Sequence, residues 1–247
     1  MGLANKFSIA YGIAQSLKDN GADLLFTSQT DYFKTKISDI AKEFGNHEVM
    51  LCDVSLDGEI EKAFDEIHNQ IGDIDFIVHS IAFADKNELT GRYCDTTRSN
   101  FLNAMNISCY SFTEVCKYAA QKLMPAGGSI LALTYYGSEK VVQNYNVMAI
   151  AKAALETSVM YIANDVGSSG IRVNAVSAGP IKTLASSGVG DFSRILEIDR
   201  NRSPLRRNIT QKDIGDACTF LLSDMASGIT GEVVHVDCGC STIGVRF

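Results

Sequence analysis

The sequence lacks the marks of membrane and secreted proteins. No apolar run approaches the roughly 18 residues needed to cross a bilayer, and no basic segment followed by an apolar one opens the chain, so neither a membrane span nor a signal peptide is expected. Met1-Gly2 matches the start of an N-myristoylation signal, but Lys6 stands where that signal requires Ser or Thr. These absences favour a protein of the cytoplasm with no membrane partner.

An excess of positive charge is also absent. The 22 basic and 29 acidic residues leave a net charge of −7, which argues against a nucleic-acid partner. The seven cysteines are scattered and odd in number, as expected for reduced thiols and not for a disulfide framework. His235, Cys238 and Cys240 cluster near the C-terminus, but Cys-x-Cys with one histidine is a poor match to zinc spacing, so no metal is expected.

Short apolar segments alternate with longer segments of helical periodicity over the whole chain, and 46% of the 247 residues are apolar. The expected strands are 22–28, 48–52, 74–80, 128–134, 171–177 and 232–237. The expected helices are 9–20, 34–44, 58–71, 96–123, 145–166 and 211–223. This alternation predicts one α/β domain over residues 1–247, a doubly wound Rossmann-type parallel sheet with helices on both faces. The irregular or weakly helical stretch from about 181 to 207 is of the kind that serves as an active-site lid.

The chain begins with a segment that could cradle a phosphate. Gly2, Ser8 and Gly12 lie before and within the expected helix from Ile9, where small residues and free N–H groups attract an anion. Their spacing is not G-x-G-x-x-G, and an ordinary loop before a helix remains the alternative. Such a cradle follows a buried strand of about five or six residues, and none precedes Gly2. Either a central strand is missing from this chain, or the start shown is internal to a longer chain. We favour the second, because a gap in the sheet would leave backbone groups unpaired.

Residues at the carboxyl ends of the expected strands are candidates for binding a dinucleotide. Gln29 is neutral and no arginine follows it closely, which favours NADH, although Lys34 and Lys36 leave NADPH as the alternative. Asp53-Val54 is a candidate adenine contact, and Asp53 could equally be a helix N-cap. Ser80-Ile81-Ala82 follows the next strand and lies where ligands bind in open parallel sheets.

Tyr145 and Lys152 are the candidate catalytic pair. They are seven residues apart, which is two helical turns, so both side chains are expected on one face of one helix. A neighbouring ammonium favours the phenolate, so we expect it to lower the pKa of the tyrosine from about 10. Tyrosine and lysine also recur on helices by chance. The shorter spacing Tyr-x3-Lys occurs as Tyr118/Lys122 and Tyr136/Lys140.

Together these segments resemble the NADH-dependent enoyl-[acyl-carrier-protein] reductases, a divergent branch of the short-chain dehydrogenase/reductase family, over essentially the whole chain. That branch uses Tyr-x6-Lys. The motifs that carry the resemblance are Asn5-Lys6-Phe7-Ser8-Ile9-Ala10-Tyr11-Gly12, Cys52-Asp53-Val54, His79-Ser80-Ile81, Asn144-Tyr145-Asn146-Val147-Met148, Ala151-Lys152, the run 172–185 (RVNAVSAGPIKTLA) and Gly231-Glu232-Val233-Val234-His235-Val236-Asp237.

The resemblance implies roles for individual residues. Tyr145 is expected to hydrogen-bond the thioester carbonyl, Lys152 to hold the nicotinamide ribose, and Tyr135 to complete the catalytic set. The other implied cofactor contacts are Gly2, Ser8, Ile9, Gln29, Asp53, Val54, Ser80, Ile81, Ala82, Ile181 and Thr183. The implied acyl pocket consists of Tyr135, Tyr145, Met148, Ala185, Val189 and Phe192. Ala82 departs from the family, because many members have glycine there, and it narrows the space beside the nicotinamide.

The implied reaction is reduction of the C2=C3 double bond of a trans-2-enoyl-[acyl-carrier-protein] with NADH, the last step of the bacterial type II fatty acid elongation cycle, by a cytoplasmic homotetramer. One alternative is an ordinary short-chain 3-oxoacyl or carbonyl reductase, which predicts a serine at Tyr135 and Tyr-x3-Lys on the long helix. Two further alternatives are a non-catalytic dinucleotide-binding protein and an inactive truncated NAD-binding protein.

The segment 193–208 is rich in arginine and offers a further expectation. On an acidic protein it could dock the acidic carrier protein. The alternative is an intramolecular network with Asp191, Glu197 and Asp199. The arginines are Arg194, Arg200, Arg202, Arg206 and Arg207.

Overall fold

The computed structural model describes residues 1–45, 48–183 and 192–244. The strands are β1 Phe26–Ser28, β2 Val49–Leu51, β3 Phe76–His79, β4 Gly128–Thr134, β5 Ile171–Ala178 and β6 Val233–Val236. The α-helices are α1 Ile9–Asp19, α2 Asp31–Ala41, α3 Glu59–Gln70, α4 Arg98–Met105, α5 Ser111–Tyr118, α6 Asn146–Val166, α7 Phe192–Arg202 and α8 Gln211–Leu222. The predicted strands and helices are present, with ends that differ by a few residues, except that the single helix expected at 96–123 is divided. It consists of α4 and α5, with π-helical segments at Asn106–Tyr110 and Ala119–Leu123. Helix α7 lies within the stretch expected to be irregular or weakly helical.

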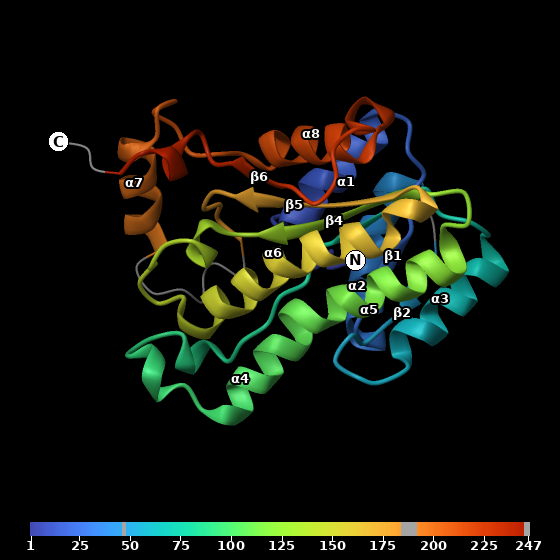
Figure 1. Cartoon of the computed structure of the whole chain (residues 1–247), viewed down its shortest axis with the longest axis horizontal. Helices are drawn as coiled ribbons and strands as arrows, with labels where there is room; N and C mark the ends of the chain where they lie inside the picture. Colours follow the sequence, from blue (N-terminus) through green and yellow to red (C-terminus); the bar gives the residue numbers. More distant parts are fainter. Residues whose placement is uncertain (46–47, 184–191, 245–247) are drawn as a thin grey trace.

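All strand pairs in the described part of the chain are parallel. They form a two-stranded sheet, β1-β2, and a four-stranded sheet in the order β3-β4-β5-β6. Helices cover both faces (Figure 1), as the doubly wound prediction requires. That prediction is confirmed, except that the described strands do not form one continuous sheet. A cavity of about 250 Å³ lies between β1 and β3.

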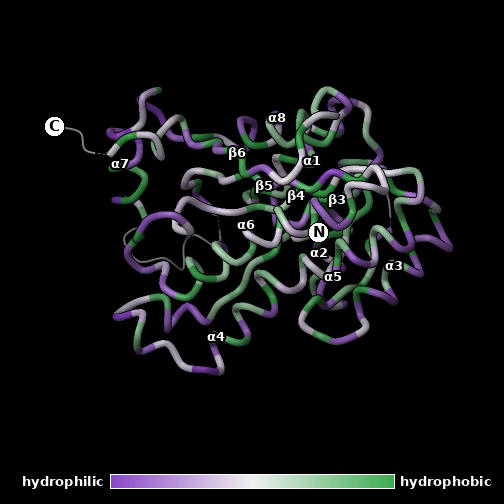
Figure 2. Tube along the Cα trace, in the orientation of Figure 1, coloured by the Kyte–Doolittle hydropathy of each residue, from purple (hydrophilic) through white to green (hydrophobic). Residues whose placement is uncertain are grey.

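Two apolar cores lie on opposite faces of the sheet. One joins α1, α2 and α8 to the sheet, and the other joins α3, α5 and α6 to it. Hydrophilic and hydrophobic stretches alternate along outer helices such as α3 and α4 (Figure 2), because each helix turns only one face inward. Among the described residues, no helix combines the length and apolar character needed to span a membrane.

Gly12 has a packing role that the sequence did not indicate. It lies inside α1, where a Cβ atom would come within 2.4 Å of the Cβ of Gln211. Gly215 on α8 is equally tight, because its Cβ would lie 2.5 Å from the Gly12 carbonyl oxygen. The two glycines let α1 and α8 pack at close range, and this contact fixes how the N-terminus of α1 is presented to the ends of the strands.

The helix that carries Lys152 begins later than predicted. Tyr145 is the N-cap residue of α6, with φ −113° and ψ −24°. Asn144 and Asn146 on either side have positive φ of 63° and 32°. The expectation that Tyr145 and Lys152 share one helix face is therefore wrong for Tyr145, whose direction is set by an irregular loop. The Asn146 amide anchors this loop by donating to the carbonyls of Glu88, Thr90 and Gly91 at 3.2 to 3.4 Å.

Candidate active site

The predicted site residues gather at one edge of the sheet. Gln29 follows β1, Asp53 follows β2, Ser80 follows β3 and Tyr135 follows β4. Because the strands are parallel, their carboxyl ends share an edge, which is where open α/β sheets bind ligands. Ile181 and Thr183 follow β5 on the same edge, and α7 lies on the side toward which the arrows of β4 and β5 point (Figure 1).

Gly2 brings the N-terminal segment against the end of β3. Its φ is +91°, and a Cβ atom there would lie 2.0 Å from the carbonyl oxygen of Ser80 and 3.3 Å from the side chain of Ile81. Only glycine permits this approach and this backbone conformation. Ser8 is the N-cap residue of α1, and its hydroxyl donates to the carbonyl of Asn5 at 2.6 Å instead of capping the helix. The backbone N–H groups of the first turn of α1 therefore have no cap from this side chain, which suits a phosphate ligand.

Gln29 and Asp53 meet across the ends of β1 and β2. The Gln29 amide donates to Asp53 Oδ2 at 3.1 Å, and the other Asp53 oxygen accepts from the backbone N–H and hydroxyl of Ser55 at 3.0 and 2.6 Å. The N-cap of α3 is Gly58, so the alternative that Asp53 caps this helix is wrong. Val54 is buried beside it. A neutral amide and a carboxylate at this position suit a ribose with free hydroxyls and would repel a 2′-phosphate.

Tyr135 and Tyr145 form an aromatic pair at the end of β4. Their ring centroids are 5.1 Å apart at an interplanar angle of 78°, an edge-to-face contact. Gly137 makes room for it, because a Cβ atom there would lie 2.5 Å from the Tyr145 ring. Gly137 is thus a positioning residue that sequence reasoning missed, and only the packing reveals it.

Burial raises the pKa of both phenols. For Tyr145 burial has the largest effect, followed by the neighbouring Tyr135 and Glu156. For Tyr135, burial again comes first, followed by the charge of Asp199. The expected lowering of the Tyr145 pKa by Lys152 is therefore wrong for the protein without ligands. Both phenols stay protonated near neutral pH and can donate a hydrogen bond to a substrate oxygen.

Lys152 is a buried cation, 5% exposed, whose ammonium donates to the carbonyl oxygen of Leu133 at 2.7 Å. Burial lowers its pKa to about 8, an effect that the charges of Cys109 and Glu156 oppose. Glu156, one turn further along α6, accepts from the hydroxyls of Thr134 and Ser138 at 2.5 and 2.6 Å. It ties the end of β4 and the loop after Tyr135 to the helix of Lys152. Sequence reasoning missed Glu156, although its i+4 spacing from Lys152 was a usable signal.

The predicted acyl-pocket residues are only partly within the described chain. Met148 is buried among Leu89, Ala104 and Val147, with Tyr145 packed against the same cluster. Phe192 opens α7 and is half-buried. Ala185 and Val189 lie outside the described residues. Ile81 is half-buried and Ala82 is exposed after β3. Ile9 and Ile181 both pack against the core beneath α1 and α8.

The two Tyr-x3-Lys pairs have other roles. Lys122 forms ion pairs with Asp65 and Glu61 at 2.6 and 3.2 Å, and the Tyr118 hydroxyl donates to Glu61 at 3.0 Å. This pair fastens the end of the α5 segment to α3, away from the strand ends. The Tyr136 hydroxyl accepts from Arg202 on α7 at 3.4 Å.

The arginine-rich segment is partly engaged within the protein. Arg207 pairs with both carboxylate oxygens of Asp213 at 2.7 and 2.8 Å, and the Arg202 guanidinium donates to the carbonyl oxygen of Ile243. Asp199 accepts from the Cys240 thiol at 3.0 Å. Asp213, the partner of Arg207, was not among the acidic residues expected to pair with these arginines. Asp191, one of those expected residues, lies outside the described residues.

We expect NADH affinity to depend on the protonation of Lys152. The ammonium donates more hydrogen bonds than the amine, so the Kd for NADH should be constant below pH 8 and rise above it by at most about tenfold per pH unit. Titration of NADH fluorescence from pH 6.5 to 10 measures this. Lys152→Arg, whose charge persists over that range, should remove the rise. A rise of equal size in Lys152→Arg would assign the pH dependence to another group.

The chain is similar to known proteins over nearly its whole length. A family model described as "Enoyl-(Acyl carrier protein) reductase" matches residues 2–241. An enoyl-[acyl-carrier-protein] reductase [NADH] of Rickettsia conorii is 51% identical over 98% of this chain and 93% of its own length. The crystal structure of the Anaplasma phagocytophilum reductase in complex with NAD is 50% identical, with a TM-score of 0.96 over 100% of this chain and 94% of that one. The Bacillus cereus reductase, solved with NADP+ and indole naphthyridinone, is 48% identical, with a TM-score of 0.96 over 99% and 96%.

Proposed function

Because the chain belongs to the enoyl-(acyl carrier protein) reductase family, we propose that it reduces the C2=C3 double bond of a trans-2-enoyl thioester on acyl carrier protein, with NADH, as the last step of fatty acid elongation. The family expected from the sequence is confirmed. The observation that carries the chemistry is the pair of protonated phenols, Tyr135 and Tyr145, at the end of β4.

The strand ends suit a dinucleotide. Gly2 lets the N-terminal segment pack against Ser80 at the end of β3, where a Cβ atom would collide, and Gln29 with Asp53 offers hydrogen-bond partners to the adenosine ribose. In this proposal Lys152 holds the nicotinamide ribose and Ser80 lies along it, while Ile181 bonds the carboxamide and Thr183 the pyrophosphate. When bound, NADH supplies the hydride that adds to the β-carbon of the substrate. The neutral Gln29 favours NADH over NADPH for this chain.

Tyr145 stabilises the charge that develops on the substrate. Hydride addition at the β-carbon moves an electron pair onto the thioester oxygen, giving an enolate. A phenol that is still protonated donates a hydrogen bond to that oxygen, and the partial burial of Tyr145 strengthens the bond because it limits competition from water. A proton then adds to the α-carbon to complete the reduction. Tyr135 and Gly137 hold the Tyr145 ring in place.

The carrier protein is proposed to dock beside α7, within the proposed lid at 181–207. Arg194 and Arg200 lie on α7 with exposed side chains, whereas Arg207 is already paired with Asp213. Exposed cations near the site entrance would attract an acidic carrier and raise its association rate at low salt.

Self-association into a homotetramer is also proposed. The segment from α4 to α6 carries several exposed apolar side chains: Leu102, Tyr110, Met160 and Tyr161 are 60%, 55%, 54% and 72% exposed. Surfaces of this kind mark contacts between proteins. Seven free cysteines support a reducing compartment such as the cytoplasm.

An NADH oxidation assay tests the proposal. Crotonyl thioesters of acyl carrier protein and of coenzyme A should both be reduced, and a 3-oxobutanoyl thioester should not be. Consumption of the 3-oxoacyl substrate with the enoyl substrate untouched would identify an ordinary short-chain reductase instead. Docking predicts a higher kcat/KM at low salt for the thioester of acyl carrier protein than for that of coenzyme A. Equal values for the two thioesters would contradict the docking proposal and leave the proposed reaction unaffected.

A further inference from the structure

Glu156 on α6 holds the strand end that leads into Tyr135. Its Oε1 atom accepts hydrogen bonds from the hydroxyls of Thr134 and Ser138 at 2.5 and 2.6 Å. Thr134 directly precedes Tyr135 in the chain, and Ser138 follows it by three residues. One carboxylate oxygen therefore fixes the backbone on both sides of Tyr135.

The chain between these two anchors forms a tight turn. Tyr135 is the N-cap residue of a single 3₁₀-helical turn, and its carbonyl accepts from the backbone N–H of Ser138 at 2.9 Å. Gly137 lies inside this turn, where a Cβ atom would come within 2.5 Å of the Tyr145 ring. The hold of Glu156 on the turn thus acts on both phenols, on Tyr135 through its backbone and on Tyr145 through the space at Gly137.

Lys152 and Glu156 bind consecutive residues of β4. They are four residues apart on α6, so both side chains leave the same face of the helix. The Lys152 ammonium donates to the Leu133 carbonyl at 2.7 Å, and Glu156 accepts from the next residue, Thr134. The two side chains are close enough for the negative charge of Glu156 to raise the pKa of Lys152, against the larger effect of burial.

The other groups that surround Lys152 carry no charge near pH 8, the value to which burial lowers the pKa of this lysine. Cys109 faces it from the π-helical segment beside α6 and acts on it only once its thiol ionises, and burial raises the pKa of that thiol. Tyr135 and Tyr145 are uncharged as well, because burial raises the pKa of both phenols.

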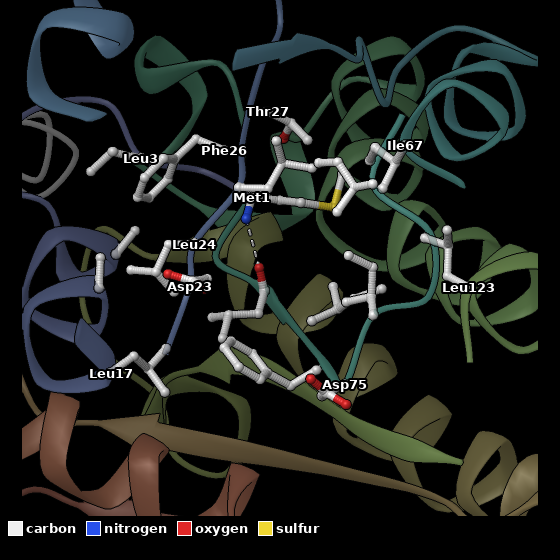
Figure 3. A pocket seen from close by; sticks show the side chains of 18 of the residues that line it. Met1, Leu3, Leu17, Asp23, Leu24, Phe26, Thr27, Ile67, Asp75 and Leu123 are labelled. Carbon is white, nitrogen blue, oxygen red and sulfur yellow. Dashed lines mark hydrogen bonds between the residues drawn. The ribbon is translucent and has the colours of Figure 1, made fainter. Parts of the chain in front are cut away.

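The groups on β3 are also neutral in this range. Burial lowers the pKa of His79, on which Lys152 acts, to about 3. The Met1 amine acts on His79 in turn, and Figure 3 shows its hydrogen bond to the Val78 carbonyl. Burial lowers the pKa of this amine to about 6. Among the described residues that interact with Lys152, Glu156 is therefore the one that is charged where the lysine titrates.

We propose that Glu156 is a positioning residue with two separable effects: its charge keeps Lys152 protonated at neutral pH, and its Oε1 atom holds the turn that carries Tyr135. The importance of a protonated Lys152 for NADH binding rests on the proposed function. The two effects themselves are properties of the protein without ligands and can be measured without a substrate.

Glu156→Gln separates the charge from the hydrogen bonds. The amide oxygen can still accept from both hydroxyls, but the anion is lost, so we expect the pKa of Lys152 to fall from about 8 by about one pH unit. NMR titration of the lysine Cε signals in the full chain measures this, and Lys152→Arg identifies the signal. Asp165→Asn is the matched control, because it removes an exposed carboxylate near the far end of the same helix. It should move the pKa of Lys152 by less than about 0.2 pH units.

Glu156→Ala removes the acceptor as well and should release the turn. Amide exchange at Ser138, whose N–H bonds the Tyr135 carbonyl, should become about tenfold faster in Glu156→Ala and change by less than about twofold in Glu156→Gln. Gly170 closes another 3₁₀-helical turn, at the other end of α6, and should keep its exchange rate in both variants. NMR-detected hydrogen exchange on the full chain gives all of these rates.

Each effect has an outcome that would overturn it. An unchanged pKa of Lys152 in Glu156→Gln, or an equal fall in Asp165→Asn, would overturn the effect of the charge. Equal exchange at Ser138 in Glu156→Gln and Glu156→Ala would overturn the hold on the turn. With the expected fall in pKa, the protonated fraction of Lys152 at pH 8 drops from about one half to about a tenth, so the Kd for NADH should rise about fivefold. A fall in the pKa with no rise in Kd would uphold the charge effect and contradict the NADH-binding role of Lys152 in the proposed function.

Discussion

Tyr145→Phe should lower kcat for enoyl reduction by about 10²–10³-fold, the usual effect of removing one preorganised donor to a developing oxyanion. The Kd for NADH should change by less than about twofold. Phenylalanine keeps the edge-to-face contact with Tyr135 and the space beside Gly137, so only the hydroxyl is lost. Steady-state kinetics with crotonyl-[acyl-carrier-protein], together with NADH fluorescence titration, separates the two quantities.

Tyr136→Phe is the matched control, because it removes the same hydroxyl from the chain neighbour of Tyr135, where that hydroxyl bonds Arg202 instead. Its kcat should stay within about twofold of the original. Lys152→Ala should show the reverse pattern of Tyr145→Phe, with NADH binding weakened more than kcat. If Tyr145→Phe impaired NADH binding and spared kcat, the roles given to these two residues would have to be exchanged.

Gly2→Ala should weaken NADH binding by about tenfold or more, equivalent to at least 1.4 kcal/mol. The added Cβ would lie 2.0 Å from the Ser80 carbonyl oxygen, so the N-terminal segment must move away from the end of β3. This movement would lengthen the bond between the Ser80 N–H and the Met1 carbonyl, now 3.2 Å. Fluorescence titration with NADH gives the affinity, and urea unfolding gives the accompanying change in stability.

Gly21→Ala provides the control for backbone strain. Gly21 has nearly the same positive φ, +88°, but no atom lies within 4 Å of its added Cβ. Both substitutions carry the cost of a left-handed residue, about 1–2 kcal/mol, and only Gly2→Ala adds a collision at the site. Equal NADH affinities in the two variants would show that the close approach of Gly2 to Ser80 is not needed for binding.

Much of the fold could be predicted from the sequence because the signals are local. The apolar run 128–134 coincides with β4, and the helical periodicity from Gln211 coincides with the start of α8. Parallel strands bring their carboxyl ends together, so Gln29, Asp53 and Ser80 could be placed at one edge without coordinates. The start of α6 could not be predicted, because the positive φ of Asn146 depends on where its amide finds carbonyl partners at 88–91.

The sequence by itself determined the alternation of strands and helices, the family resemblance and the candidate pair Tyr145/Lys152. Tertiary structure alone decided that burial raises the pKa of Tyr145, that Glu156 ties β4 to α6, and that a cavity lies between β1 and β3. The physical reason is the same in each case. Desolvation, hydrogen bonding and cavity shape depend on segments that are far apart in the chain and meet only in the folded protein.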